Sequence, residues 1–400
     1  AMPKFTILQT LIDRLNLVSR EILTGIPVIR AFSREKHEEE RFEKANLDLT
    51  KTNLFVNRCM TFMMPIMMLI MNGVSVLIIY SGAHAVDNGT MQVGNVMAFI
   101  QYAMQIIMSF LMITAMSIML PRANVAALRI DEVLKTEVSI QDPETPVHPS
   151  ENVKGEIEFD HVSFAYPEAG ENVLTDISFK AKKGQTIAVI GSTGSGKSTL
   201  INLIPRYYDV TKGSVKVDGV DVRDMTQKEL RDKLGYVPQK GVLFSGTIDS
   251  NIRYGKPEIT DAQVKEAAEV AQATEFIDTK PEKYESPVSQ GGTNVSGGQK
   301  QRLSIARAIA KDPEIFIFDD SFSALDFKTD SQLRKALKEY TKDATTVIVA
   351  QRISTILGAD QIIVLDDGHM AGIGTHKELM ANCEVYQQIA RSQLSEEELA

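Results

Sequence analysis

A glycine-rich loop near the middle of the chain has the residue types and spacing of a phosphate-binding site. It reads Gly191-Ser-Thr-Gly-Ser-Gly-Lys-Ser-Thr199 and directly follows the apolar run Thr186–Ile190. Glycines let the backbone curl so that amide N–H groups point at a β-phosphate, while the lysine neutralises phosphate oxygens and the next hydroxyl ligates Mg²⁺. A purely structural turn would not need this spacing or the Lys-Ser pair. The predicted nucleotide-binding residues are Ser192, Thr193, Gly194, Ser195, Gly196, Lys197, Ser198 and Thr199, and Ser198 is also a predicted metal ligand.

A second element typical of such a site is an apolar run that ends in carboxylates. The run Ile315–Phe318 is followed by Asp319 and Asp320. In phosphate-loop NTPases the aspartate at the end of a strand holds the Mg²⁺ shell, so Asp319 is predicted to be a metal ligand. An apolar run before an aspartate is common, and this one gains weight because it follows both the glycine-rich loop and the next motif.

The third motif is a short Ser-Gly-Gly-Gln run, Ser296, Gly297, Gly298 and Gln299, which leads into a predicted helix over Lys300–Ala310. Such a run at a helix start forms an anion-binding nest, in which Ser296 supplies a hydroxyl and the helix N-terminus supplies the field. A plain helix cap is the alternative interpretation of this motif taken alone.

The elements that must position these motifs are short apolar, β-rich runs alternating with helices, which is typical of an α/β nucleotide-binding fold. The helical stretch from about Thr260 to Ala310 predicts a subdomain within it. The expected strands are Ile157–Phe159, Thr186–Ile190, Ile315–Phe318, Thr346–Val349 and Gln361–Leu365.

The charge distribution shows that this fold is only part of the chain. From Cys59 to Pro121 there are 63 residues and a single formal charge, Asp87. The net charge of −9 argues against nucleic acid as a partner. The two cysteines, Cys59 and Cys383, are too far apart to suggest a disulfide framework or a metal cluster.

The uncharged block divides into two predicted membrane spans, at about 59–81 and 95–120, because each half reaches the roughly 20 residues that a bilayer core needs. A turn-rich loop at His84–Gly89 separates them. By the positive-inside rule, basic flanks place both outer ends in the cytoplasm. Buried helices of a soluble protein are the alternative. The flanking cations are Lys44, Lys51, Arg58, Arg122 and Arg129.

The predicted organisation is therefore an α/β P-loop nucleotide-binding cassette with a helical subdomain, preceded by an all-α transmembrane segment. Residues 1–134 form a partial transmembrane domain, 135–152 a proline-containing linker, and 153–400 the cassette. The first part is an amphipathic helix, with a break expected at Gly25-Ile26-Pro27.

Together these motifs resemble an ATP-binding-cassette exporter across essentially the whole chain. Besides the glycine-rich loop, the match covers Gln239 in Tyr-Val-Pro-Gln, the signature Val-Ser-Gly-Gly-Gln, and Ser323-Ala-Leu-Asp326. The segment Leu23–Phe32 resembles the family's second intracellular coupling segment, placed at about 20–35. The resemblance implies that the two spans are the last two of six, and that the other transmembrane helices lie outside this chain.

The resemblance also implies roles for single residues. Tyr166 should stack on adenine, and Gln239 should sense Mg²⁺ and the γ-phosphate, which makes it a predicted nucleotide-binding, metal-binding and catalytic residue. The signature at Ser296–Gln299 should cap an ATP bound mainly by a partner subunit. Asp326 should lie in the loop that touches the opposite site.

Two departures from the family pattern matter for catalysis. Most members have Glu after the strand-end aspartate, where it polarises the attacking water, but this chain has Asp320, and a misplacement of about 1 Å costs on the order of 100-fold. The family's His near the γ-phosphate is Gln351, a neutral amide. With Gln239, these are the predicted catalytic residues. Gln290 replaces a further common Glu, while the signature differs only at Val295.

A weakened site beside a nearly intact signature resembles the degenerate-site subunit of heterodimeric bacterial multidrug exporters. The predicted function is ATP-driven export of amphipathic drugs, with ATP and Mg²⁺ as cofactors. The expected partners are a second half-transporter, the lipid bilayer and a hydrophobic small-molecule substrate. The protein should be multi-pass in the cell membrane, with a cytoplasmic cassette.

Three alternatives remain open at this stage. One is a lipid or peptide exporter working as a slow homodimer, and another is a nucleotide-gated regulatory subunit. The third is a soluble ATPase of the chromosome-maintenance or repair type, against which the uncharged block argues. A methionine stripe could line a substrate cavity, or serve ordinary packing or lipid contact; it comprises Met104, Met108, Met112 and Met116.

Overall fold

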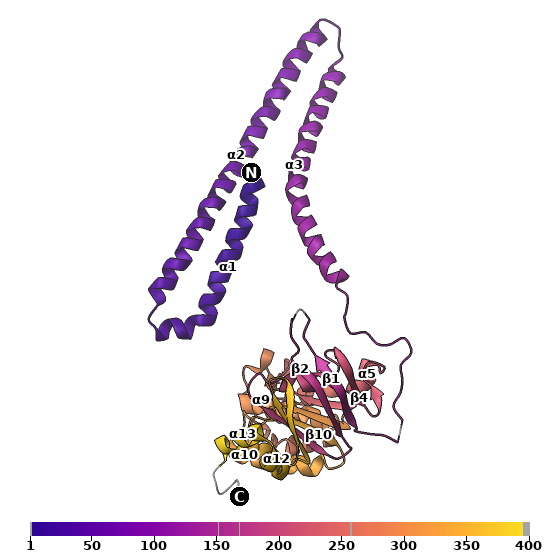
Figure 1. Ribbon diagram of the computed structural model, residues 1–400. Helices are drawn as coiled ribbons and strands as arrows, with labels where there is room; N and C mark the ends of the chain where they lie inside the picture. The colour runs from indigo at the N-terminus through magenta and orange to yellow at the C-terminus, as the bar shows by residue number, and fades with distance from the viewer. Residues whose placement is uncertain (1, 151, 168, 257, 395–400) are drawn as a thin grey trace. The chain divides into compact units, whose positions relative to one another are not determined.

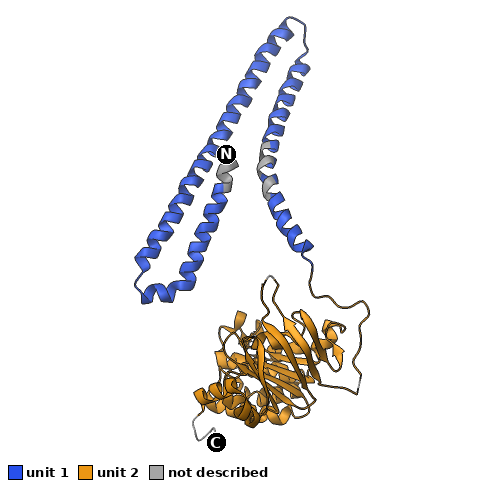
Figure 2. Ribbon diagram, viewed as in Figure 1, with its two compact units in different colours: residues 1–137 blue, residues 138–400 orange. Residues whose placement is uncertain are grey.

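The chain folds into two compact units in a computed structural model, residues 1–137 and residues 138–400 (Figure 2). The structure describes residues 2–150, 152–167, 169–256 and 258–394, without the side chains of residues 2–6, 60, 114–115, 117–118 and 121–122. The predicted cytoplasmic flank Arg122 is one of those undescribed side chains. Each unit is described by itself below.

Unit 1 consists of three long helices, α1 (Met2–Ala31), α2 (Glu35–Asp87) and α3 (Val93–Lys135) (Figure 1). The break expected at Gly25–Pro27 is wrong as a helix end, because α1 remains helical through Pro27 to Ala31. Figure 1 shows that the helix axis instead changes direction near the C-terminal end of α1. A proline inside a helix removes one hydrogen bond and bends the axis without ending the helix.

Neighbouring helices of this unit contact one another at identifiable residues. On α1 and α2, Glu21 forms an ion pair with Arg41 at 2.5 Å. Between α2 and α3 the close approach is at Gly82, where an added Cβ would lie 2.7 Å from a methyl carbon of Val96. Small residues at such points let helices approach closely in a membrane, where apolar burial between helices gives little driving force.

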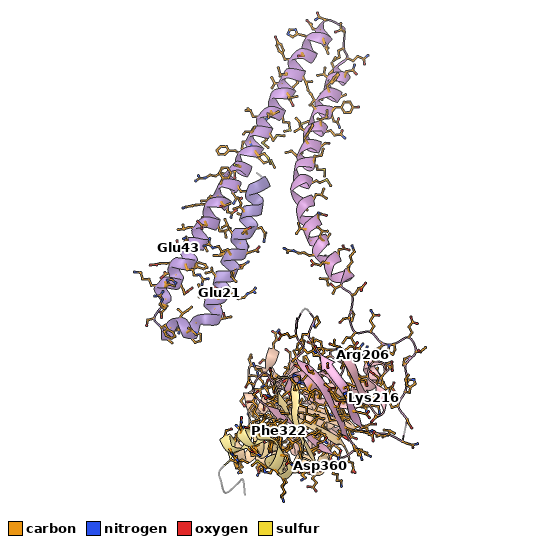
Figure 3. All side chains as sticks on the ribbon, viewed as in Figure 1. Glu21, Glu43, Arg206, Lys216, Phe322 and Asp360 are labelled. Atoms are coloured by element: carbon orange, nitrogen blue, oxygen red, sulfur yellow. The ribbon has the colours of Figure 1, made fainter. Side chains whose placement is uncertain are left out.

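Two helices of unit 1 are long and apolar enough to cross a membrane by length and composition. They are α2, with a window of mean hydropathy 2.2, and Val93–Ile113 of α3, with a value of 1.9. None of either window is buried inside the protein. In Figure 3 the side chains of these helices project outward, whereas those of unit 2 fill a dense interior. Exposed apolar helices of this kind need a surrounding apolar medium or further helices.

Unit 2 is built on two main sheets. The larger is six-stranded, in the order β12-β11-β3-β10-β9-β6, and the smaller is four-stranded, in the order β2-β1-β4-β5. The strands of the larger sheet are β12 (His369–Gly374), β11 (Gln361–Asp366), β3 (Thr186–Gly191), β10 (Thr345–Val349), β9 (Ile315–Asp319) and β6 (Leu234–Val237). Those of the smaller sheet are β2 (Leu174–Ala181), β1 (Ile157–Phe164), β4 (Lys212–Val217) and β5 (Val220–Asp221). A two-stranded ribbon pairs β7 (Gly246–Thr247) with β8 (Pro287–Val288).

The pairing of the larger sheet explains where a site can form. Strands β6, β9, β10, β3 and β11 pair in parallel, so their carboxyl ends meet at one edge. Strands buried on both faces are near-continuously apolar, as β9 is. All five strands expected from the sequence are present, which confirms the α/β class of the cassette.

Ten α-helices of the described residues surround these sheets. They are α4 (Lys197–Leu203), α5 (Gln227–Asp232), α6 (Ile248–Ile252), α7 (Asp261–Val270), α8 (Thr274–Asp278), α9 (Gly297–Ala310), α10 (Phe327–Tyr340), α11 (Ile353–Ile356), α12 (His376–Asn382) and α13 (Glu384–Gln393). Helices α6 to α9 share one apolar cluster with β9 and α10 residues, which forms the helical part of the unit.

The segment before β1 follows the surface of unit 2 without regular structure. Asp142 accepts a hydrogen bond from the Gln227 backbone at 2.9 Å, and the Val147 N–H donates to the Asp224 carbonyl at 2.8 Å. These contacts with α5 and the turn before it explain why the compact unit begins at Val138.

Candidate functional site

The glycine-rich loop joins the end of β3 to the start of α4. Gly194 and Gly196 have φ angles of 85° and 96°, which favour glycine. At Gly191 an added Cβ would lie 2.2 Å from the Leu365 carbonyl oxygen, so the loop is held against the end of β11. The loop therefore needs glycine both for its turn and for its close packing.

Lys197, the first residue of α4, directs its ammonium group back into this loop. Its Nζ donates to the carbonyls of Gly191 and Ser192, at 2.9 and 2.6 Å. Burial lowers the pKa of Lys197, and the charges of Asp320 and Asp319 oppose that effect. A half-desolvated cation beside two carboxylates is suited to neutralising phosphate oxygens in the same space.

Ser198 and Asp319 come together across the sheet edge. The Ser198 hydroxyl donates to Asp319 Oδ1 at 3.0 Å, and Asp319 is only 6% exposed. Burial raises the pKa of Asp319, the hydrogen bond from Ser198 lowers it, the Asp320 charge raises it, and the Lys197 charge lowers it. Two hard oxygen donors held this close are a donor set suited to Mg²⁺.

Asp320 stands one residue beyond β9 with φ of 45°, a backbone conformation that aspartate tolerates better than most residues. Its N–H donates to the Val349 carbonyl at 3.0 Å, which ties it to the end of β10. Its Oδ2 accepts from two amides, Gln351 Nε2 at 2.7 Å and Gln239 Nε2 at 3.3 Å. The three predicted catalytic residues therefore form one hydrogen-bonded cluster.

Tyr166 lies next to this region on the chain segment after β1. Its hydroxyl is 3.0 Å from that of Thr199 in α4, and its ring makes edge-on contacts with Phe164 and Tyr208. The aromatic residue predicted to stack on adenine thus contacts the helix that carries the phosphate loop.

The signature residues lie elsewhere in the unit. Ser296 caps α9 in a reciprocal pair with Gln299, in which Gln299 N donates to Ser296 Oγ at 3.3 Å and Ser296 N to Gln299 Oε1 at 3.1 Å. Ser296 and Gly297 are exposed, and Gly298 is half-buried. Within the described part of the chain, no hydrogen bond joins Ser296–Gln299 to the phosphate loop.

Asp326 caps α10 by accepting from the Thr329 N–H at 3.0 Å. Hydrogen bonds from the Thr329 backbone and side chain lower the pKa of Asp326. Its side chain is therefore an exposed, anionic helix cap, oriented by its own first turn.

Sequence reasoning missed the residues that hold the cluster in place. Gln301 of α9 donates to the Pro238 carbonyl at 3.1 Å, which positions the segment of Gln239. Gln393 of α13 donates to the Gln351 carbonyl and accepts from the Ile353 N–H, both at 2.8 Å. These partners are 63 and 42 residues apart in sequence. No local pattern signals such contacts.

Family models match both units of the chain. Residues 5–110 match the ABC transporter transmembrane region, and residues 174–323 match the ABC transporter family. With the exposed apolar helices and the phosphate loop, these matches define a membrane protein that carries an ATP-binding cassette.

Similar proteins and one solved structure define the class of membrane protein more closely. An uncharacterized ABC transporter ATP-binding protein of Mycobacterium tuberculosis is 45% identical over 98% of this chain and 68% of its own length. A Bacillus subtilis protein, YgaD, whose name refers to multidrug export, is 39% identical over 90% of this chain and 62% of its own length. The structure of a bacterial Atm1-family ABC exporter with ATP bound aligns with a TM-score of 0.83 and 28% identity, covering 99% of this chain and 70% of that chain.

The chain belongs to the ABC exporters, an ATP-hydrolysing family with transmembrane and ATP-binding cassette regions. It spans about two thirds of the length of the mycobacterial relative. ATP binding follows from the cassette, and a lipid bilayer is the medium of the transmembrane region.

Proposed function

We propose that this chain is one half of a heterodimeric exporter of amphipathic drugs, and that its own ATP site binds nucleotide but hydrolyses it slowly. The observation that carries the proposal is the cluster at Asp320, whose Oδ2 accepts from both Gln351 and Gln239. The multidrug export named for a relative motivates the substrate class.

The first argument concerns the reach of the acid. Asp320 is one methylene shorter than glutamate, and its backbone is held at the end of β9 by the Val349 carbonyl. A carboxylate oxygen has two lone pairs in its plane, and two amide donors already bind to Oδ2. Only Oδ1 then remains to orient an attacking water, from a position further back than glutamate would offer.

The second argument concerns charge. Gln351 carries no proton that it can lose or gain near neutral pH, whereas a histidine at the same place could bear a positive charge. Gln351 directs its amide at Asp320 and so holds the acid. Stabilisation of charge that develops in the transition state is usually the largest catalytic contribution, and this position cannot supply a cation.

Unlike the catalytic positions, the positions expected to bind nucleotide and Mg²⁺ carry the residue types that binding needs. Lys197 and the loop amides would hold the phosphates, Tyr166 would stack on the base, and Ser198, Asp319 and Gln239 would hold Mg²⁺. When bound, Mg²⁺ supplies Lewis-acid neutralisation of phosphate charge. A chain that binds nucleotide through these residues can associate with a partner cassette even if its own ATP hydrolysis is slow.

The exposed position of the signature residues supports a role for a partner subunit at a shared ATP site. Ser296 and Gly297 are exposed at the start of α9 and make no hydrogen bond to the phosphate loop in the described residues. We propose that Ser296–Gln299 and Asp326 complete an ATP site whose phosphate loop belongs to a second, different half-transporter.

The proposal includes a membrane arrangement. Residues 1–134 form part of a multi-pass transmembrane domain in the cell membrane, 135–152 are a linker, and 153–400 are a cytoplasmic cassette. The basic residues that flank the two apolar windows support a cytoplasmic position for both ends.

The test compares ATP binding with ATP turnover in the purified protein, alone and with candidate partner subunits. Nucleotide affinity should be ordinary, and turnover should be slow alone and fast only in a complex whose partner carries Glu and His at the corresponding positions. If the protein alone hydrolyses ATP as fast as that complex, the proposal is wrong.

A further inference from the structure

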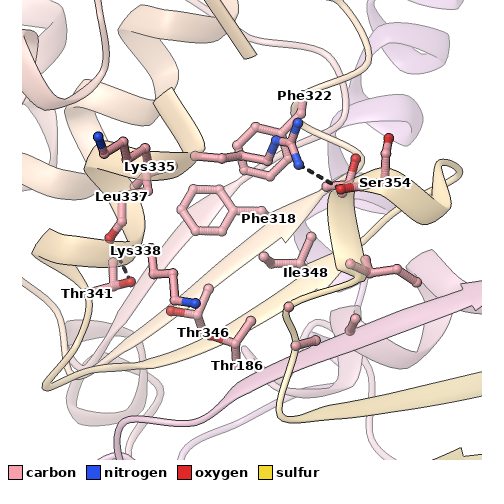
Figure 4. A pocket seen from close by; sticks show the side chains of 16 residues that line it. Thr186, Phe318, Phe322, Lys335, Leu337, Lys338, Thr341, Thr346, Ile348 and Ser354 are labelled. Atoms are coloured by element: carbon pink, nitrogen blue, oxygen red, sulfur yellow. Dashed lines mark hydrogen bonds between the residues drawn. The ribbon is translucent and has the colours of Figure 1, made fainter. Parts of the chain in front are cut away.

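A cavity of about 350 Å³ lies in unit 2, away from the phosphate loop (Figure 4). It lies between the larger sheet, α10 and α11. Side chains alternate between the two faces of a strand. One face of β3 and β10 carries Ile187 and Val347 into the cluster shared with α4, so Ala188 and Ile348 on the other face line the cavity.

The inner wall of the cavity is apolar with a polar end. Phe318 and Ile348 lie in the middle of the view in Figure 4, with Thr186 and Thr346 at one side. Thr346 is 5% exposed, and its Oγ1 has no hydrogen-bond partner in the described part of the chain. The hydroxyl oxygen of Thr346 has almost no surface exposed to the cavity, so the wall that a ligand would meet is chiefly apolar.

The rim of the cavity is cationic. Arg334, Lys335 and Lys338 line it, and no Asp or Glu is among its lining residues. Arg334 is already engaged, since it pairs with Asp330 at 2.9 Å and donates to the Ser354 carbonyl at 2.8 Å. Among the described residues, Lys335 and Lys338 have no carboxylate within the 4.0 Å of an ion pair.

Two acids near the cavity have partners of their own. Asp330 pairs with Arg334, and Asp360 accepts from the Thr186 N–H at 2.8 Å. Lys335 and Lys338, both exposed on α10, thus lie beside an apolar wall without an ion pair among the described residues. In Figure 4 the Lys338 side chain extends over the side where Thr186 and Thr346 lie.

We propose that this cavity binds a small amphipathic anion, namely a carboxylate on an aryl or alkyl body. The apolar body would lie on Phe318 and Ile348, and the carboxylate would meet Lys338 at the rim. Ligand sites of this size are concave and mostly apolar, with a few polar groups that fix orientation. The inference concerns a second site and does not depend on the heterodimer proposal.

The experiment titrates the purified full protein with 4-phenylbutyrate by calorimetry and by saturation-transfer NMR. Saturable binding is expected, and neutral 4-phenylbutanol and free acetate should each bind at least about tenfold more weakly, because each lacks one half of the recognition. Empty detergent micelles measure partitioning of the probe. An absence of saturable binding, or equal binding of the alcohol, would overturn the proposal.

Variants then locate the site. Lys338→Glu should weaken phenylbutyrate binding about tenfold or more. Lys342→Glu is the matched control, because Lys342 is an exposed lysine that does not line the cavity. Thermal melting checks folding, and Lys335→Glu replaces any variant that fails to fold. Equal losses in the Lys338 and Lys342 variants would mean that the probe senses only overall charge, which contradicts the assigned site.

Discussion

The phosphate loop and the cluster at Asp320 lie at the same sheet edge, but their geometry depends on different structural features. The loop works through backbone geometry, with Gly194 and Gly196 at positive φ and Gly191 packed against β11. The Asp320 cluster works through side-chain length and charge, with two amides on one carboxylate oxygen. From this difference we expect that nucleotide binding and nucleotide hydrolysis can be changed separately, because different atoms would supply the two functions.

The largest expected effect is a loss of nucleotide binding at the phosphate loop. Lys197→Ala should weaken ATP binding about 100-fold, because it removes a charge-assisted contact from a partly desolvated site. Equilibrium binding of a fluorescent ATP analogue measures it. Lys183→Ala, at an exposed position before β3, is the control and should bind normally. Normal binding by the Lys197 variant would show that the loop is not the nucleotide site.

The next effect is an increase in ATP hydrolysis. The double variant Asp320→Glu with Gln351→His should raise ATP turnover of the assembled complex about tenfold or more, since it restores the reach of the acid and a titratable group. Turnover and ATP affinity are measured together. Higher turnover at unchanged affinity supports the separation of the two functions, and unchanged turnover in a stably folded variant contradicts it.

A smaller effect distinguishes the signature from the phosphate loop. Ser296→Ala removes the cap of α9 and should cost about 1 kcal/mol of unfolding free energy. ATP affinity of this chain's own loop should not change, whereas hydrolysis by the proposed heterodimer should fall. Chemical denaturation and ATP titration separate the two outcomes. If the Ser296 variant lost ATP binding at this chain's own loop, the assignment of Ser296 to the partner's ATP site would be wrong.

The smallest effect concerns Asp319 and pH. Burial raises the pKa of Asp319 above its ordinary value of 3.8, so the folded state binds the proton more readily than the unfolded state. The contribution of this group to stability therefore falls as pH rises from about that value through the raised pKa. Asp319→Asn should make the nucleotide-free protein more stable than the wild type at pH 7.

Melting curves at a series of pH values provide the check on Asp319. The difference between variant and wild type should shrink as the pH falls, because the wild-type carboxylate becomes protonated and loses its desolvation cost. A difference that stays constant with pH would mean that the substitution acts through packing instead.

Much of the fold could be predicted because its signals are local. The strand runs, the uncharged block and the glycine-rich loop each follow from neighbouring residues, and all five expected strands were found. The break at Gly25–Pro27 was predicted wrongly, because a local rule treats proline as a helix end, whereas a proline inside a helix removes one hydrogen bond and α1 continues to Ala31. Local propensity is a weak guide where tertiary packing competes with it.

The sequence by itself determined which chemical groups this protein has, namely a lysine and glycines for phosphate, two aspartates after an apolar strand, and a glutamine in place of a histidine. Only the tertiary structure decided that Gln351 and Gln239 share one oxygen of Asp320, and that Gln301 and Gln393 hold their segments. It also placed Lys335 and Lys338, which have no ion pair among the described residues, beside the cavity next to the sheet. The physical reason is that residue types are local, whereas a hydrogen bond or a cavity depends on chain segments brought together from many positions apart.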